Sequence, residues 1–257
     1  MKLSIIMRCW NRLEYTVRSI ISISELSGLD RSEYEILCVD QNSTDGTREW
    51  LKHAYSEGYY SVVPVLLEEN VGDGLGMNYG IKVAEGEFIC QHDSDCELVT
   101  PNYYKHLIDL YEALEKEGHK ICALGGSHKQ GLEIDSAPFR FGRQRYGDRN
   151  FIHLSGKEVN KGSDVYLFTR IYMAAWVTAS FIFRKKFGEE LEFGKGMCNS
   201  WCGHFWDLGY TNFICESIKF YHIDSGETGA HIQKQYDKFP SYSYIFRHYR
   251  NFIKKQD

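Results

Sequence analysis

The chain is poor in proline and contains no long hydrophobic run. Only 4 of its 257 residues are proline, so no proline-rich linker is available to separate domains. No stretch approaches the ~18 apolar residues of a membrane-spanning helix, and the longest candidate, residues 173–183, is predicted to be a strand. The apolar run at the N-terminus is too short for a signal peptide. We therefore expect a cytoplasmic protein.

A strong net charge and a cysteine motif are also missing. The net charge of −5 and the pI of about 6.1 give the chain no general attraction to nucleic acid. Its 8 cysteines form no Cys-x-x-Cys pair, and several lie in apolar runs typical of reduced, core-packing cysteines. Aromatic residues are abundant at 15%, which suits both an aromatic core and a cleft that stacks flat rings. With 43% hydrophobic and 25% charged residues, the composition is that of a globular protein.

The first half alternates predicted strands with predicted helices. Apolar runs predict strands at residues 3–7, 35–39, 62–67, 87–91 and 120–125. Amphipathic segments predict helices at 13–26, around Trp50, around Ile81, and from Thr100-Pro101 to about residue 117. This alternation is typical of an α/β fold with a mainly parallel sheet. After residue 125 the pattern loosens into a polar, Arg-rich segment, predicted strands at 164–168 and 177–184, and an aromatic, basic tail.

Polar loops follow four of the predicted strands, at residues 8–12, 40–45, 70–76 and 93–95. Ligands of parallel α/β sheets bind beyond the carboxyl ends of the strands. We therefore predict that these four loops converge on one rim.

The last of these loops is Asp93-Ser94-Asp95. Two carboxylates one residue apart at a strand end can hold Mn²⁺ or Mg²⁺ while the ion coordinates a diphosphate. His222 is a candidate for completing the metal shell. The alternatives are a solvated turn and a capped surface histidine. The glycine-rich segments at 72–76 and 188–195 lack the spacing of a phosphate-binding loop.

Four segments, in order, resemble the motifs of family 2 glycosyltransferases with the GT-A fold. Residues 4–12 resemble the first motif, 35–47 the second and 69–89 the third, and Asp93-Ser94-Asp95 falls where that family keeps its metal-binding DxD motif. The resemblance covers residues 3–100 and is weaker over 179–222. It implies one GT-A domain over 1–257, with a Rossmann-like, mainly parallel sheet flanked by helices. We expect a nucleotide-sugar-binding half (1–125), an acceptor-side half (126–230) and a C-terminal tail (231–257).

The resemblance also implies roles for individual residues. Trp10 stacks on the nucleotide base, and Asp40 accepts a hydrogen bond from it. Asp93 and Asp95 serve the ribose and the metal–diphosphate, with His222 closing the metal shell. The remaining residues expected at the donor site are Cys9, Asn11, Arg12, Asn70, Gly72, Asn78 and Ser94.

The chain departs from the family pattern in the donor site and in the expected general base. Arg8 replaces a small residue or proline, Gln41 replaces an acid, and Met77 stands where an arginine often precedes the asparagine of the third motif. One phosphate or base contact is therefore lost, or is supplied by Arg8 or Arg12. The acidic pair that contains the base of inverting members is missing.

His204 and Asp207 are the nearby candidates for the missing general base. Either residue fits equally well on the exposed side of a structural helix. Inversion is favoured, while a retaining enzyme that needs no base at this position is the alternative.

The expected function is a metal-dependent glycosyltransferase that moves a sugar from a nucleotide diphosphate sugar to an acceptor hydroxyl. The acceptor is a glycan, a lipid-linked molecule or another hydroxyl compound. The basic tail could rest peripherally on an anionic membrane or form a solvated helix, and a nucleic-acid acceptor is not expected. Two alternatives are a non-catalytic module that binds nucleotide-sugar or glycan, and a nucleotidyltransferase, which would carry a glycine-rich loop where residues 9–12 stand.

Overall fold

The computed structural model of the chain describes residues 1–128, 157–158, 165–168, 175–180, 182, 205 and 208–222. Within these residues, ten strands form one sheet in the order β3-β2-β1-β4-β9-β6-β10-β8-β7, and β5 pairs with β10 beside this path. The strands are β1 (Leu3–Cys9), β2 (Tyr34–Gln41), β3 (Val62–Leu67), β4 (Phe88–Asp93), β5 (Cys96–Leu98), β6 (Ile121–His128), β7 (Lys157–Glu158), β8 (Val165–Phe168), β9 (Ala175–Ala179) and β10 (Thr211–His222). The helices are α1 (Leu13–Leu26), α2 (Thr47–Ser56), α3 (Gly72–Val83) and α4 (Tyr103–Lys116).

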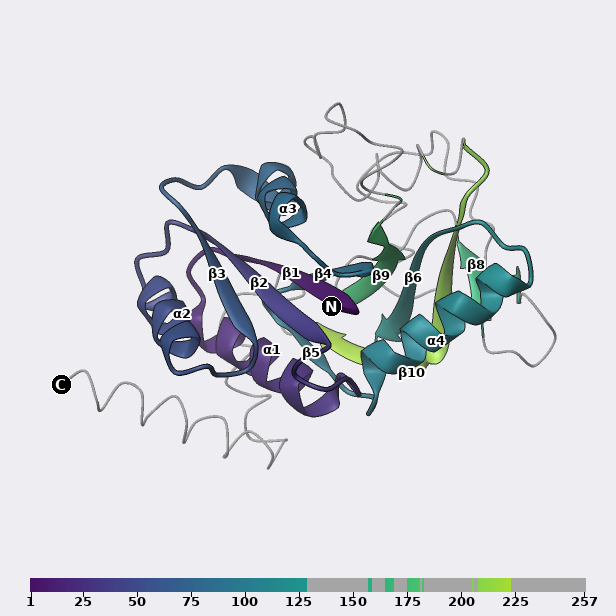
Figure 1. The fold of residues 1–257 in the computed structure, drawn as a ribbon, viewed down its shortest axis with the longest axis horizontal. Coiled ribbons are helices and arrows are strands. Elements are labelled where there is room, and N and C mark those ends of the chain that lie inside the picture. The colour runs from purple at the N-terminus through teal and green to yellow at the C-terminus, as the bar shows by residue number, and fades with distance from the viewer. Residues whose placement is uncertain are drawn as a thin grey trace.

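The N-terminal half is the parallel α/β unit that the sequence predicts. Strands β3, β2, β1 and β4 are parallel neighbours, with α1 and α2 on one face and α3 on the other (Figure 1). Helix α1 and strand β3 have the predicted bounds, and the other predicted elements of this half match within a few residues. Most buried residues of these strands are hydrophobic, as expected for a sheet covered on both sides, and the buried polar exceptions are Ser4, Asp40, Gln41, Gln91 and His92.

The bounds of strand β9 differ from the predicted ones. The sequence predicts a strand over 177–184, within the longer apolar run 173–183, but β9 begins at Ala175 and ends at Ala179. Its antiparallel ladder with β4 ends where β4 begins, at the pair Phe88–Ala179, and the next bond runs from Ser180 N to Glu87 O. The partner strand therefore sets the end of β9, and Ser180 already has helical geometry.

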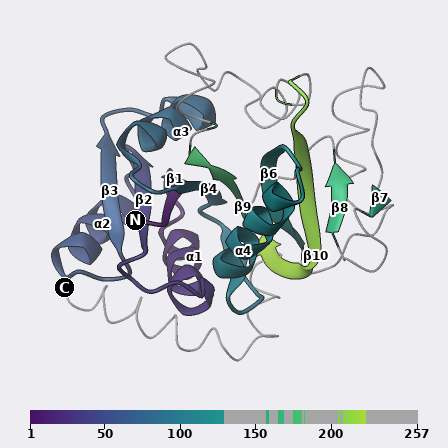
Figure 2. The same ribbon diagram turned by 45° about the vertical axis from the view of Figure 1, so that its right-hand side comes forward.

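Strand β10 lies between β6 and β8 in the sheet. It pairs in parallel with β6 and antiparallel with β8 and β5 (Figure 2). Its register against β6 slips between Cys215 and Lys219, where Glu216 and Ser217 turn away from the buried face. These polar residues interrupt the apolar pattern, which is why the sequence analysis predicts no strand over residues 211–222.

The start of helix α4 also differs from the prediction. The helix begins at Tyr103, after Asn102, which has a positive φ of 57°. Thr100, predicted to lie at the helix start, instead accepts a hydrogen bond at Oγ1 from Lys219 N, at 2.7 Å. This contact ties the segment before α4 to β10.

The cysteines of the described part are buried and free, as their apolar surroundings predict; they are Cys9, Cys38, Cys90, Cys96, Cys122 and Cys215. None of the helices in the described residues is long and apolar enough to cross a membrane.

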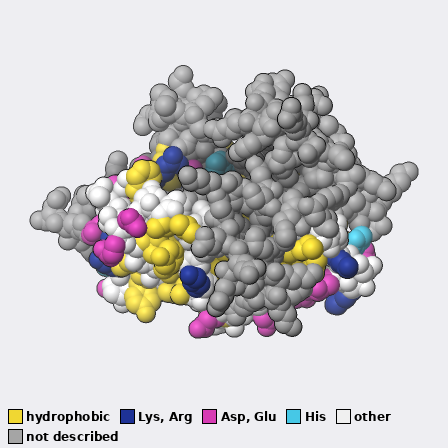
Figure 3. Space-filling view, turned by 90° about the horizontal axis from the view of Figure 1, so that it is seen from above, with side chains coloured by type: hydrophobic (Ala, Val, Ile, Leu, Met, Phe, Trp, Pro, Cys, Tyr) yellow, Lys and Arg dark blue, Asp and Glu magenta, His cyan; other side chains and the backbone are white. Residues whose placement is uncertain are grey.

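Some large apolar side chains remain exposed. Helix α3 exposes Leu75, Tyr79 and Val83, spaced four residues apart. Figure 3, which looks from the side of α3, shows hydrophobic side chains at the surface among acidic and basic ones.

Candidate functional site

The polar loops meet at one rim, as predicted. The loop after β1 binds the loop after β2: Asn11 N donates to Ser43 Oγ at 2.8 Å, and Thr44 N donates to Asn11 Oδ1 at 2.9 Å. The start of α3 lies against the same loops, because a Cβ placed on Gly76 would lie 3.4 Å from Gln41 and 3.5 Å from Arg8. The carboxyl ends of the strands thus form a continuous polar edge.

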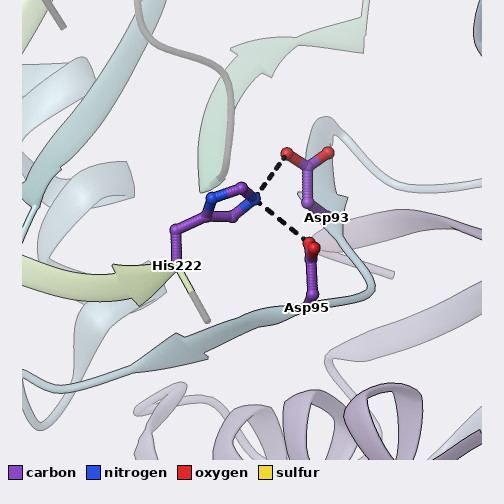
Figure 4. A group of neighbouring side chains, drawn as sticks. All are labelled: Asp93, Asp95 and His222. Carbon is purple, nitrogen blue, oxygen red and sulfur yellow. Dashed lines mark ion pairs between the residues drawn. The ribbon is translucent and has the colours of Figure 1, made fainter. Parts of the chain in front are cut away.

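Asp93, Asp95 and His222 point toward one another at this edge (Figure 4). Asp93 ends β4, Asp95 lies in the turn before β5, and His222 ends β10. His222 Nε2 lies 3.1 Å from Asp95 Oδ1 and 3.7 Å from Asp93 Oδ2. One ligand atom from each residue lies within 4.8 Å of the other two, which fits a single divalent cation.

Two arginines from the first loop bind the same carboxylates. Arg8 Nη2 lies 2.9 Å from Asp93 Oδ1, and Arg12 Nη1 lies 2.9 Å from Asp95 Oδ2. Each carboxylate therefore gives one oxygen to an arginine and turns its other oxygen toward His222. The Arg8 side chain is largely buried, whereas that of Arg12 is half exposed.

The surroundings keep Asp95 ionised. Burial alone would raise the pKa of Asp95, but the hydrogen bond from His222 and the charges of His222 and Arg12 outweigh it and lower the pKa. A deprotonated carboxylate is the form that binds a metal ion.

A buried histidine, which the sequence analysis did not identify, holds the turn between Asp93 and Asp95. His92 Nε2 lies 2.9 Å from the carbonyl oxygen of Cys96, so this nitrogen carries the proton and donates it. Its other nitrogen, Nδ1, accepts a hydrogen bond from Tyr104 Oη. Burial lowers the pKa of His92 to about 4, so the ring is neutral. The ring therefore connects the two ends of the turn.

On the other side of the rim, Asp40 is fully buried at the end of β2. Its Oδ2 accepts a hydrogen bond from Ser43 N at 3.3 Å and lies 3.5 Å from Arg48 Nη1. Its Oδ1 accepts no hydrogen bond from the residues that the structure describes. Trp10, at the end of β1, is 54% exposed, which leaves its ring available for stacking.

The other predicted site residues lie around this rim with different exposures. Asn70 Oδ1 accepts a hydrogen bond from Gly72 N at 2.9 Å, which shapes the start of α3. Asn78 and Ser94 are half-buried, while Cys9 is fully buried and packs into the core. The two candidates for a general base, His204 and Asp207, lie outside the described residues, as does the tail 231–257.

Ligands of a parallel α/β sheet bind beyond the carboxyl ends of its strands, which is where this polar rim lies. The sequence profile of Glycosyl transferase family 2 matches residues 4–153, and the chain belongs to that family. The resemblance of the sequence to this family is therefore confirmed.

Curated relatives match part of the chain. The poly(ribitol-phosphate) beta-glucosyltransferase of Bacillus spizizenii is 34% identical over 96 residues, which are 37% of this chain and 15% of that protein. The putative teichuronic acid biosynthesis glycosyltransferase TuaG of Bacillus subtilis is 31% identical over 118 residues, or 44% of this chain and 46% of that protein. The matches thus span less than half of each of these two relatives.

Solved structures show the same fold. The mannosyltransferase PcManGT from Pyrobaculum calidifontis, in complex with GDP-Man and Mn²⁺, aligns with a TM-score of 0.62 at 14% identity, over 89% of this chain and 59% of its own. TarS 1–349 from S. aureus, in complex with UDP-GlcNAc, aligns with a TM-score of 0.58 at 17% identity, over 89% and 62%. The predicted GT-A fold is confirmed.

Proposed function

We propose that the protein is a metal-dependent glycosyltransferase that moves a sugar from a nucleotide diphosphate sugar to an acceptor hydroxyl. The observation that carries this proposal is the convergence of Asp93 Oδ2, Asp95 Oδ1 and His222 Nε2 at the carboxyl edge of the sheet, in a chain of family 2. Two structural neighbours, one solved in complex with GDP-Man and Mn²⁺ and the other with UDP-GlcNAc, support a donor of this class.

The three ligand atoms would hold Mn²⁺ or Mg²⁺. Two carboxylate oxygens suit either ion, and the imidazole nitrogen favours Mn²⁺. When bound, the ion would act as a Lewis acid that neutralises charge on the departing diphosphate.

The other residues of the rim bind and orient the donor in this proposal. Trp10 offers an exposed ring for the base. The open oxygen of Asp40 is a buried acceptor, and a base N–H would satisfy it once the side chains that cover it move aside. Asn11, Arg12, Asn70, Gly72, Asn78 and Ser94 line the same loops and are proposed donor contacts.

The acceptor and the reacting base remain proposals for the second half of the chain. Residues 126–230 are proposed to bind the acceptor, with His204 or Asp207 taking the proton from its hydroxyl. The name of one relative, a poly(ribitol-phosphate) beta-glucosyltransferase, favours a glycan or other polyhydroxyl acceptor, free or lipid-linked. A cytoplasmic location and a peripheral membrane contact of the tail stay predictions.

Thermal unfolding against UDP, GDP, dTDP and CMP and their sugars, with and without Mn²⁺, tests donor binding. A ligand at 100 times its Kd stabilises the folded state by ~2.7 kcal/mol, which is readily measured. We expect one nucleotide to stabilise the protein only with the metal, and we expect Asp95→Asn to remove this effect. No shift with any nucleotide would overturn the proposal.

Turnover separates an enzyme from a binding module. Release of the nucleotide diphosphate in the presence of candidate acceptors is expected for the transferase. Binding without release over the whole acceptor panel would favour the non-catalytic module, for which the missing acidic pair is the supporting observation. Release of pyrophosphate would indicate a nucleotidyltransferase.

A further inference from the structure

The two carboxylates of the candidate metal group already have cationic partners. Asp93 Oδ1 binds Arg8 and Asp95 Oδ2 binds Arg12, each at 2.9 Å, while the opposite oxygens face His222. An imidazole that ligates a metal ion is neutral, so the two guanidiniums and two carboxylates then give this group a formal charge of zero. A metal ion that enters it therefore finds no excess of negative charge.

A divalent ion bound between these residues would raise the local charge to +2. The two guanidiniums repel that ion, and they also hold the carboxylates that it needs. A diphosphate reverses this balance, because it brings at least two negative charges and oxygens that arginine binds in a bidentate manner. Metal and diphosphate together leave the site close to neutral.

We propose that Arg8 and Arg12 make metal binding conditional on the nucleotide diphosphate, so that the ion alone binds weakly and the pair binds tightly. This inference rests on the proposed function and adds a coupling between its two ligands. Because coupling free energies are reciprocal, the metal must strengthen nucleotide binding by the same factor.

The two arginines contribute in different ways. Arg12 directly precedes α1 and has a positive φ of 64°. Its side chain is half exposed, so it can leave Asp95 and turn to a phosphate oxygen. The Arg8 side chain is 9% exposed and lies against Gly76 and Asp93, so it acts as a fixed positive charge. Arg12 is thus the exchanging phosphate ligand, and Arg8 is a positioning residue.

Titration calorimetry with Mn²⁺ tests the coupling, first without nucleotide and then with saturating UDP or GDP, whichever stabilises the protein. We expect the nucleotide to tighten Mn²⁺ binding to the unaltered protein by at least about tenfold. In Arg12→Met and Arg8→Met, Mn²⁺ alone should bind about tenfold more tightly, while the nucleotide binds more weakly and the coupling falls. Lys105→Met, which removes an exposed cation paired with Asp109 on α4, should change none of these values.

In the arginine variants Mn²⁺ affinity should rise while nucleotide affinity falls, and these opposite changes distinguish this role from a structural one. A loss of folding would weaken metal and nucleotide binding together, and Arg12→Lys, which keeps the charge without the guanidinium fork, should retain part of the coupling. Arg8→Met and Arg12→Met variants with the same Mn²⁺ affinity and the same coupling as the unaltered protein would overturn the inference while leaving the proposed function intact. No binding of any nucleotide, with or without metal, would overturn both.

Discussion

Arg18 Nε lies 2.5 Å from Glu97 Oε1, and both side chains are nearly buried. This ion pair joins α1 to β5, two residues beyond Asp95. Glu97 also faces Tyr221 in the ladder between β5 and β10, next to His222. The pair therefore links α1 to β5, which follows Asp95 directly, and to its partner β10, which ends at His222.

Removing one partner of this pair should strongly destabilise the protein. Arg18→Met leaves the buried Glu97 without its guanidinium, and breaking a buried ion pair in this way costs about 3–5 kcal/mol. Chemical denaturation should show a loss of this size. The matched control is Lys2→Met, whose partly exposed pairs with Glu87 and Glu112 predict a loss below about 1 kcal/mol.

The double variant Arg18→Met/Glu97→Met tests whether the unpaired charge of Glu97 causes the loss of stability. Replacing both charges with apolar side chains of similar length should recover most of the lost stability. If Arg18→Met were as stable as the Lys2 control, the pair would contribute nothing to the attachment of α1.

His92 should support the metal and nucleotide site without touching either ligand. His92→Phe keeps a buried ring but removes the hydrogen bond to the carbonyl of Cys96, so the turn from Asp93 to Asp95 loses its brace. Losses of this kind typically lower metal affinity about 10–100-fold. Calorimetric titration of Mn²⁺ with the nucleotide present measures the effect.

Tyr104→Phe is the matched control for His92. It removes only the hydroxyl that binds Nδ1 and leaves the bond to Cys96 in place. We expect a smaller loss of affinity than in His92→Phe. Equal affinities in the two variants and the unaltered protein would show that the turn needs no brace.

The sequence predicted the parts of the site that depend on local pattern. Strand ends followed by polar loops placed Asp93 and Asp95 at the rim, because parallel strands end at the same edge. It did not predict the bond between Arg8 and Asp93, which are 85 residues apart in the chain. That contact follows from the pairing of β1 with β4, where Arg8 lies directly opposite Asp93.

The elements that the sequence missed are short or interrupted. Strand β5 has 3 residues, with the charged Glu97 in its centre, and it exists only because β10 pairs with it. The brace formed by His92 was also missed, because the ring is buried and its Nδ1 is bound by Tyr104 on the next helix. Such features depend on tertiary packing, which local propensity does not encode.

Asp45 should make the stability of the protein depend on pH. Its Oδ2 accepts a hydrogen bond from Leu13 N at the start of α1, and its Oδ1 accepts bonds from Thr47 at the start of α2. Burial alone would raise the pKa of Asp45, but these hydrogen bonds together lower it. A lowered pKa means that this contribution is complete above the unfolded-state pKa of ~3.9 and is lost as pH falls through the folded-state value.

Asp45→Asn provides the comparison. At pH 7 the variant should lose about 1 kcal/mol of unfolding free energy, because a neutral amide has one acceptor oxygen and makes weaker hydrogen bonds than an ionised carboxylate that accepts with both oxygens. Because the unaltered protein loses this contribution in acid, the difference between the two proteins should shrink below about pH 4. A difference that stays constant from pH 7 to pH 3 would contradict the assignment.

Trp10 should contribute to nucleotide binding but not to folding. The residue is 54% exposed directly after β1, so little packing is lost when its side chain is removed. Stacking of a base on an aromatic ring contributes ~1–3 kcal/mol, so Trp10→Ala should weaken nucleotide binding about tenfold or more, and Trp10→Phe should lose less. Titration with the nucleotide in the presence of Mn²⁺ gives the affinities, and thermal unfolding without ligand should be unchanged.

Tyr55→Ala is the matched control, since Tyr55 is an aromatic residue of α2 with a similar exposure of 59%. Equal nucleotide affinity in Trp10→Ala and Tyr55→Ala would place the base elsewhere on the rim.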